Sequence, residues 1–231
     1  MWAAFTWVSY LALEPAIRRH APHTLVAWTR LLAGRFTDPA IGREVLIGVW
    51  GGLIAVALAA MRFRLYPARS ADMVLYVALE SLQSRRHFFF THLFGLADGI
   101  ETALAAAFLL ALMRLVASNV GLSACLVALV ATPLTIGGFP ISAADALLAL
   151  AVTMSNAVVF VRAGLLALIT TYIVERLLVR FPVTLDSSAW YFPGSVITLS
   201  IVAALVVYGA SVTCFASTRP AAAAARRPAG V

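Results

Sequence analysis

The residues of this chain best suited to chemistry gather in one stretch, HFFFTHLFGLADGIE, at residues 87–101. His87 and His92 flank an aromatic run, and Asp98 and Glu101 follow three residues apart. Imidazoles and carboxylates together can bind a divalent metal. However, the five-residue gap does not place both histidines on one helix face, as an HExxH motif does. We therefore expect no metal site, but interfacial histidines followed by two carboxylates at the positive end of a helix.

Four further ionisable residues stand in or beside the later apolar blocks: Arg114, Asp145, Arg162 and Glu175. Charge within a bilayer is costly, so such residues mark a functional site by default. Asp145, Arg162 and Glu175 each lie near the end of a predicted helix. Long side chains that reach the interface, or a pair between Asp145 and Arg162, explain these residues without transport.

The sequence lacks the groups that several catalytic classes require. All 17 basic residues are arginine, so a lysine that binds phosphate or forms a Schiff base is excluded. No GxSxG motif appears, and the serines of the apolar blocks have no neighbouring histidine base. We expect neither a catalytic residue nor a cofactor.

The elements that must position these residues are membrane helices. Hydrophobic residues make up 62% of the 231 positions and charged residues 12%, with a mean hydropathy of +0.95. The apolar residues form blocks near the roughly 20 residues that a helix needs to cross a bilayer. Because lipid cannot satisfy free backbone groups, and no barrel-like alternation is present, these blocks should be helices. The sequence predicts an all-α polytopic transmembrane bundle.

Six or seven membrane segments are expected, of which the first is truncated. If one helix continues through Arg162, the number is six. In the seven-segment arrangement, residues 1–215 form one multi-pass domain, with spans at about 1–13, 45–61, 98–117, 120–136, 143–161, 163–179 and 194–215.

Two amphipathic interfacial segments, 14–44 and 62–97, are predicted between the first spans, and residues 216–231 are predicted to be a disordered basic tail. Gly48 and Gly52 form a GxxxG spacing, which favours close approach of another helix. Cys125 and Cys214 have no ligand-like spacing and are expected to be small buried side chains. The basic residues assigned to the first interface are Arg18, Arg19, Arg30, Arg35 and Arg43.

The net charge of +7 points to a membrane surface. The arginines lie between the spans, so anionic lipid headgroups are the expected partner and nucleic acid is not. The bias of positive charge towards the cytoplasm places segment 14–44 and the tail inside. Segment 62–97 carries five arginines of its own and falls on the opposite side in the seven-segment arrangement. We expect the inner membrane of a bacterium.

Two stretches carry a more specific signal. They are LALEPAIRRHAPHTLVAWTRLLAGRFTDPAIGREVLIG at residues 11–48 and RAGLLALITTYIVERLLVRFPVTLDSSAWY at residues 162–191. Both resemble the C-terminal membrane region of certain bacterial serine/threonine protein kinases, while the middle of the chain is similar only in hydropathy. The resemblance implies that this chain is a fragment of a longer kinase, whose catalytic domain lies in cis on the cytoplasmic side. The expected protein partners are such a kinase domain or other membrane subunits. The chain itself has no glycine-rich ATP loop, HRD or DFG motif.

These observations favour a non-catalytic membrane anchor or sensor of a signalling kinase. The alternative is a small multi-pass transporter or an ABC-type permease subunit, favoured by the ionisable residues near the spans. A membrane enzyme that uses His87, His92, Asp98 and Glu101 ranks third.

Overall fold

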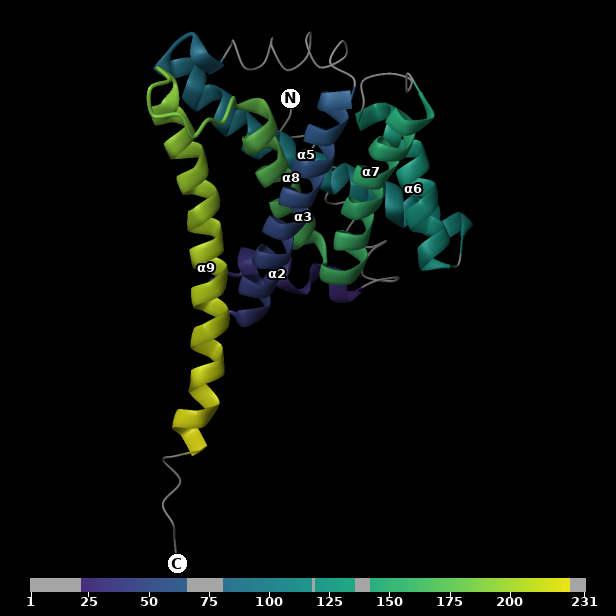
Figure 1. Cartoon of the computed structure of the whole chain (residues 1–231). Helices are drawn as coiled ribbons and strands as arrows, with labels where there is room; N and C mark the ends of the chain where they lie inside the picture. Colours follow the sequence, from purple (N-terminus) through teal and green to yellow (C-terminus); the bar gives the residue numbers. More distant parts are fainter. Residues whose placement is uncertain (1–21, 66–80, 118, 136–141, 225–231) are drawn as a thin grey trace, which may run out of the picture.

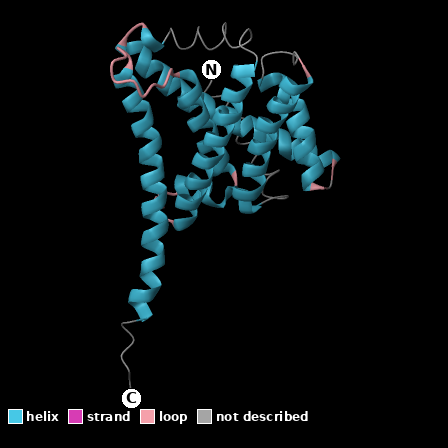
Figure 2. Ribbon diagram, viewed as in Figure 1, coloured by secondary structure: helices cyan, strands magenta, loops and turns pink. Residues whose placement is uncertain are grey.

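The computed structural model describes residues 22–65, 81–117, 119–135 and 142–224, and the regular elements in these ranges are all helices (Figures 1 and 2). They are η1 (Pro22–Leu25), α2 (Val26–Leu32), α3 (Pro39–Leu65), α5 (Arg85–Val116), α6 (Val120–Thr135), α7 (Ala143–Ala163), α8 (Leu165–Arg180) and α9 (Phe192–Ala224).

Four of these helices are long and apolar enough to cross a membrane: residues Pro39–Arg62, Arg85–Arg114, Ala143–Ala163 and Phe192–Cys214. This confirms the all-α class and supports a membrane protein. Helices α6 and α8 have 16 residues each and are only about 24 Å long, shorter than the hydrocarbon core of about 30 Å. The total of six or seven segments therefore stays a prediction.

Helices α3 and α8 lie side by side at the centre of the molecule. Helix α5 covers α8, α7 packs on α3, and α6 packs against α5 and α7. Helix α9 lies along α3 and extends well below the other helices in Figure 1. We call the end where α3 and α8 finish and α5 and α9 begin the upper end.

Glycines allow α3 and α8 to approach closely, as the GxxxG spacing predicts. A Cβ atom on Gly48 would lie 2.5 Å from the carbonyl oxygen of Ala167, and one on Gly52 would lie 2.7 Å from Cβ of Val174. The hydroxyl of Thr171 donates a 3.1 Å hydrogen bond to the carbonyl of Gly48. The two backbones are therefore in direct contact.

Gly164 separates α7 from α8, so no single helix continues through Arg162. Gly164 has a φ of +117°, a conformation that residues with a side chain rarely adopt. A Cβ at this position would also lie 2.7 Å from the carbonyl oxygen of Thr24. The chain thus reverses direction at a residue that has to be glycine.

Helices α3 and α5 begin earlier than the predicted spans. Pro39 suits the first turn of α3, and the preceding Asp38 accepts a 3.0 Å hydrogen bond from the backbone N–H of Ala40. Ser84 caps α5 by accepting a hydrogen bond from the backbone N–H of His87. Residues 39–44 and 85–97, which we assigned to interfacial segments, are therefore parts of long helices.

Three other expectations need correction or lie outside the described residues. Helix α9 continues to Ala224, so residues 216–224 of the predicted disordered tail are helical. Cys125 and Cys214 are exposed instead of buried, because they face outward from α6 and α9. The predicted span 1–13 and the interfacial arginines Arg18 and Arg19 are not among the described residues.

Candidate functional site

An ion-pair network joins α5 to α8. Oδ2 of Asp98 on α5 accepts a 2.7 Å hydrogen bond from Nη2 of Arg180 and lies 2.8 Å from Nε of Arg176. The Nε of Arg176 is not aligned to donate, so this second contact is ionic. Arg176 and Arg180 are four residues apart and therefore share one face of α8. The guanidinium of Arg180 also lies 5.1 Å from the ring centre of Phe94.

Next to this network, α8 meets α7 through three polar side chains. The side-chain amide of Asn156 lies within hydrogen-bonding reach of both Glu175 and Tyr172. Although Glu175 as a whole is only half-buried, its Oε2 is enclosed by protein without a hydrogen-bond partner, as is Oδ1 of Asn156. Asn156 is 3% exposed and Tyr172 6%. We call Asp98, Asn156, Tyr172, Glu175, Arg176 and Arg180 the buried polar cluster, in which Asn156 and Tyr172 are buried and the four charged residues are half-buried.

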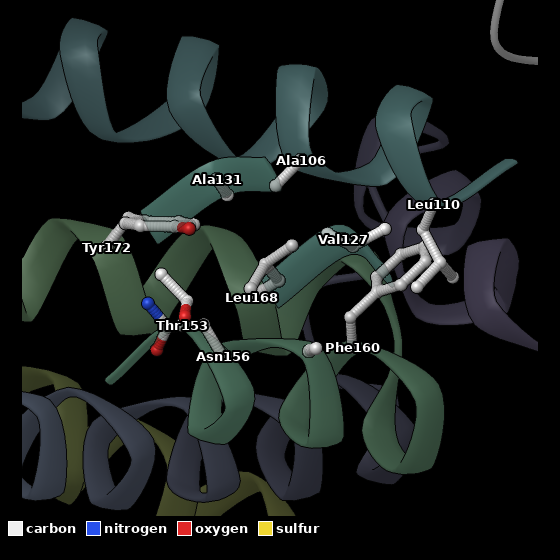
Figure 3. Close-up of a pocket in the computed structure, with 10 residues that line it drawn as sticks. Ala106, Leu110, Val127, Ala131, Thr153, Asn156, Phe160, Leu168 and Tyr172 are labelled. Carbon is white, nitrogen blue, oxygen red and sulfur yellow. The ribbon is translucent and has the colours of Figure 1, made fainter. Parts of the chain in front are cut away.

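A small cavity of about 20 Å³ adjoins the buried polar cluster (Figure 3). Tyr172, Asn156 and Thr153 form its polar side, and apolar residues that include Leu110, Val127 and Phe160 form the rest. The hydroxyls of Thr153 and Thr132 lie 3.0 Å apart beside it. A cavity needs roughly 10–15 Å³ to hold one water molecule and two to four polar partners for it. The site has room for one water with suitable partners.

The charges of the buried polar cluster balance. Two carboxylates, Asp98 and Glu175, face two guanidinium groups, Arg176 and Arg180. Burial of a charge is tolerable when an opposite charge and hydrogen bonds compensate it. Because Glu175 retains an oxygen without a hydrogen-bond partner and adjoins Asn156, which lines the water-sized cavity, the arrangement can accept a proton or one water molecule. A change there would alter the balance of charge between α5 and α8.

A second interhelical ion pair contradicts the pairing with Arg162, which was one of the two explanations considered for Asp145. Its Oδ1 lies 2.5 Å from Nε of Arg62, so α7 pairs with α3 near the upper end. The predicted partner, Arg162, is exposed and lies at the opposite end of α7, about 25 Å along the helix. Arg114 occupies the last turn of α5, as Arg162 does in α7, where cations complement the helix dipole.

The four residues considered for a metal site are not brought together. Nδ1 of His87 lies 2.9 Å from Oγ of Ser84. The two ring nitrogens of His92 contact the carbonyl of Phe88 and the hydroxyl of Thr198. No group of three or more possible metal ligands exists among the described residues. Asp98 and Glu101 also lie deep within α5 instead of in its first turn, because this helix begins at Arg85.

At the lower end, polar groups organise the start of α8. Glu44 of α3 is 4% exposed, and the backbone N–H groups of Leu166 and Ala167 point towards its carboxylate. The first N–H groups of a helix have no partner within it, so Glu44 caps α8 from a neighbouring helix.

Of the predicted interfacial arginines, Arg30 contacts both carboxylate oxygens of Asp38 at 2.9 Å, whereas Arg35 and Arg43 are exposed.

Sequence reasoning missed Asn156 and Tyr172, because both stand within apolar stretches of the sequence. A signal existed, since Thr153 and Asn156 are three residues apart and so are Tyr172 and Glu175. This spacing places each pair on one helix face. The partners of Asp98 and Asp145 come from helices distant in sequence, and no local pattern indicates them.

Comparison with known proteins gives no family for this chain. No family model, no curated protein and no solved structure matches it.

Proposed function

We propose that this chain is a non-catalytic membrane module that anchors a signalling protein and senses a change at the membrane. The proposal rests on the resemblance of two stretches of the chain to the C-terminal membrane region of bacterial serine/threonine protein kinases. The partners in this proposal are a cytoplasmic kinase domain and the anionic headgroups of a bacterial inner membrane.

The observation that carries the proposal is that the two stretches pack against each other. Residues 11–48 contribute Glu44, which caps α8, and Gly48, whose backbone contacts Ala167. Residues 162–191 contribute all of α8 and Gly164, which packs against Thr24. Gly48 and Arg162 are more than 100 residues apart in sequence, yet the described part of the first stretch, residues 22–48, packs against α8 at the centre of the bundle. A shared sequence pattern has a structural reason if it encodes such a contact.

The buried polar cluster supplies a physical basis for sensing. It is held by charges that α5 and α8 contribute, so a change in its protonation or hydration alters how these two helices attract each other. In addition, α3 begins and α9 ends at the same, lower end of the molecule (Figure 1). This arrangement is consistent with a common cytoplasmic side for segment 14–44 and the tail.

The DNA directly upstream of the Met1 codon tests the proposal. A kinase domain in the same frame, or displaced by a frameshift, is the expected result. An unrelated gene with its own stop codon and ribosome-binding site would contradict it. As a protein-level test, we expect reporter fusions at Thr37 to be active in the cytoplasm and fusions at Ser187 to be active outside. Fusions with the opposite sidedness would place the kinase partner on the wrong side.

A small transporter or permease subunit is the second candidate, favoured by the enclosed oxygen of Glu175 and the cavity beside Asn156. Single cysteines at Thr153 and at Asp98, in a variant with Cys125 and Cys214 replaced by serine, would separate the two functions. Rapid reaction of both positions with a membrane-impermeant thiol reagent favours transport. Labelling no faster than that of a lipid-facing control cysteine at Val207 favours the anchor.

A further inference from the structure

The upper end of the molecule contains a second, much larger pocket, which is separate from the buried polar cluster. It lies between the start of α5, the start of α9 and the loop that joins α8 to α9, and it has a volume of about 440 Å³. This is within the range of about 300–1,000 Å³ that is typical of ligand sites. Its main lining residues are Arg85, Phe88, Phe89, Phe181, Trp190 and Tyr191.

Aromatic packing holds the floor of this aromatic pocket in place. The ring of Phe88 meets Phe181 edge to face at 5.4 Å and lies 4.1 Å from the ring of His92. His92 is anchored in turn by a 2.9 Å contact between its Nε2 and the hydroxyl of Thr198. A Cβ on Gly194 would lie 2.5 Å from the Phe181 ring, so α9 approaches as closely as it can. These contacts hold the aromatic side chains of the pocket in place.

Hydrogen bonds also order the loop that precedes Trp190, between α8 and α9. Asp186 accepts hydrogen bonds from both the hydroxyl and the backbone N–H of Ser188. These bonds stabilise the ionised carboxylate and lower the pKa of Asp186 below its ordinary value. Trp190 and Tyr191, whose rings meet at 5.6 Å, follow directly.

The electrostatics of the aromatic pocket favour an anion. Arg85 bears the only formal charge among the described residues that line it. Ser84 and Arg85 also stand at the start of α5, where the helix dipole adds positive potential. A ligand that fits must therefore combine a negative group with an apolar body.

The pocket opens where a membrane would supply such a ligand. Phe89, near the start of α5, is 58% exposed, and Trp190, in the turn before α9, is 73% exposed. Both helices are candidate membrane spans. Aromatic and basic residues at that depth are typical of the headgroup region of a bilayer. We propose that the aromatic pocket binds one anionic phospholipid, with its phosphate at Arg85 and Ser84. The part of an acyl chain nearest the headgroup then packs against Phe88, Phe89 and Trp190. This site does not depend on a kinase-related function.

The test measures the unfolding temperature of the purified full chain in a neutral detergent with increasing phosphatidylglycerol, phosphatidylcholine or inorganic phosphate. A ligand of the folded state raises this temperature in a concentration-dependent way. We expect saturable stabilisation by phosphatidylglycerol, with at least tenfold weaker effects of phosphatidylcholine and of phosphate. Arg85→Gln should weaken the response to phosphatidylglycerol about tenfold, because a charge-assisted contact to the phosphate is lost.

Arg86→Gln is the matched control, since Arg86 is exposed, as Arg85 is, but does not line the pocket. It should respond to phosphatidylglycerol as the wild type does. The unfolding temperature without lipid shows whether either variant is destabilised by itself, and Phe89→Ala provides a second, uncharged test of the pocket. Equal losses in both arginine variants would mean nonspecific attraction to anionic lipid and would overturn the proposal. Equal stabilisation by phosphatidylcholine or by free phosphate would overturn it as well.

Discussion

Helices α8 and α9 differ in a way that reverses the rule for soluble proteins. Helix α8 buries ten of its 16 residues, although it contains Glu175, Arg176 and Arg180. Helix α9 is the most apolar of the four candidate spans, but only 22% of its spanning part is buried. The more polar helix is therefore inside and the more apolar helix is outside.

The difference follows from the solvent. Lipid tails are as apolar as leucine, so burial of an apolar side chain against protein brings little advantage in a bilayer. Close packing of small residues and contacts between polar groups favour association instead. Helix α8 has both, in its contacts with Gly48 and Gly52 and in its ion pairs to Asp98. Helix α9 meets α3 closely where Gly42 and Gly209 are in contact. Elsewhere on α9, apolar side chains such as Val206 and Val207 are exposed on the surface of the bundle.

The largest effect is expected where the backbones of α3 and α8 touch. Gly48→Ala places a methyl group 2.5 Å from the Ala167 carbonyl and should lower the free energy of unfolding by about 3 kcal/mol. Thermal unfolding in detergent would show a decrease of about 10 °C.

Gly95→Ala is the matched control for this substitution. The nearest atom to its new methyl group is Cβ of Arg176 at 3.7 Å, an ordinary contact. Because alanine favours helix more than glycine does, this variant should be unchanged or about 0.5–1 kcal/mol more stable. If the two variants unfold at the same temperature, α8 is not held by close contact with α3.

The ion pairs of α8 come next. Asp98→Asn leaves Arg176 and Arg180 without the carboxylate they share and should lower the free energy of unfolding by about 2–3 kcal/mol. Adding Arg180→Gln should recover part of the loss, because Glu175 then faces a single guanidinium, that of Arg176, and the charges balance again. A full double-mutant cycle by thermal unfolding measures this coupling. Strictly additive losses would argue against the network.

The contrast between α8 and α9 also explains how much could be predicted from sequence. The apolar blocks indicated helices at the positions of α3, α5, α6, α7, α8 and α9, because block length and hydropathy are local properties. Helices α3 and α5 begin at Pro39 and Arg85, earlier than the predicted starts at about 45 and 98. The predictions were late because apolar composition was weighted above the capping residues Asp38 and Ser84. The close approach at Gly48 and Gly52 was also indicated by local spacing.

The candidate site was only partly predictable. Asp98 and Glu175 were singled out because ionisable residues are rare in apolar blocks. Their roles were missed, since these depend on Arg180, Asn156 and Tyr172, which only the packing of α5, α7 and α8 brings near. A pairing of Asp145 with Arg162 was one of the two explanations considered for these residues. Their separation of 17 residues rules it out.

The same substitution, valine to alanine, made once in α8 and once in α9 compares how much side-chain packing stabilises each helix. Val174 on α8 is fully buried and lies against Gly52 of α3. Val174→Ala removes two methyl groups from this contact and should lower the free energy of unfolding by about 1–2 kcal/mol. Thermal unfolding in detergent checks the value, and an effect below that of the Val207 variant described next would contradict the inner position of α8.

The smallest effect is expected for the same substitution on α9. Val207 is 67% exposed on an apolar helix, so its side chain faces lipid or detergent in both the folded and the unfolded bundle. Val207→Ala therefore removes little that distinguishes the two states and should change the free energy of unfolding by less than about 0.5 kcal/mol. Thermal unfolding in the same detergent measures it. A loss as large as that of Val174→Ala would show that the outer face of α9 is covered in the folded protein, and the contrast between the two helices would then disappear.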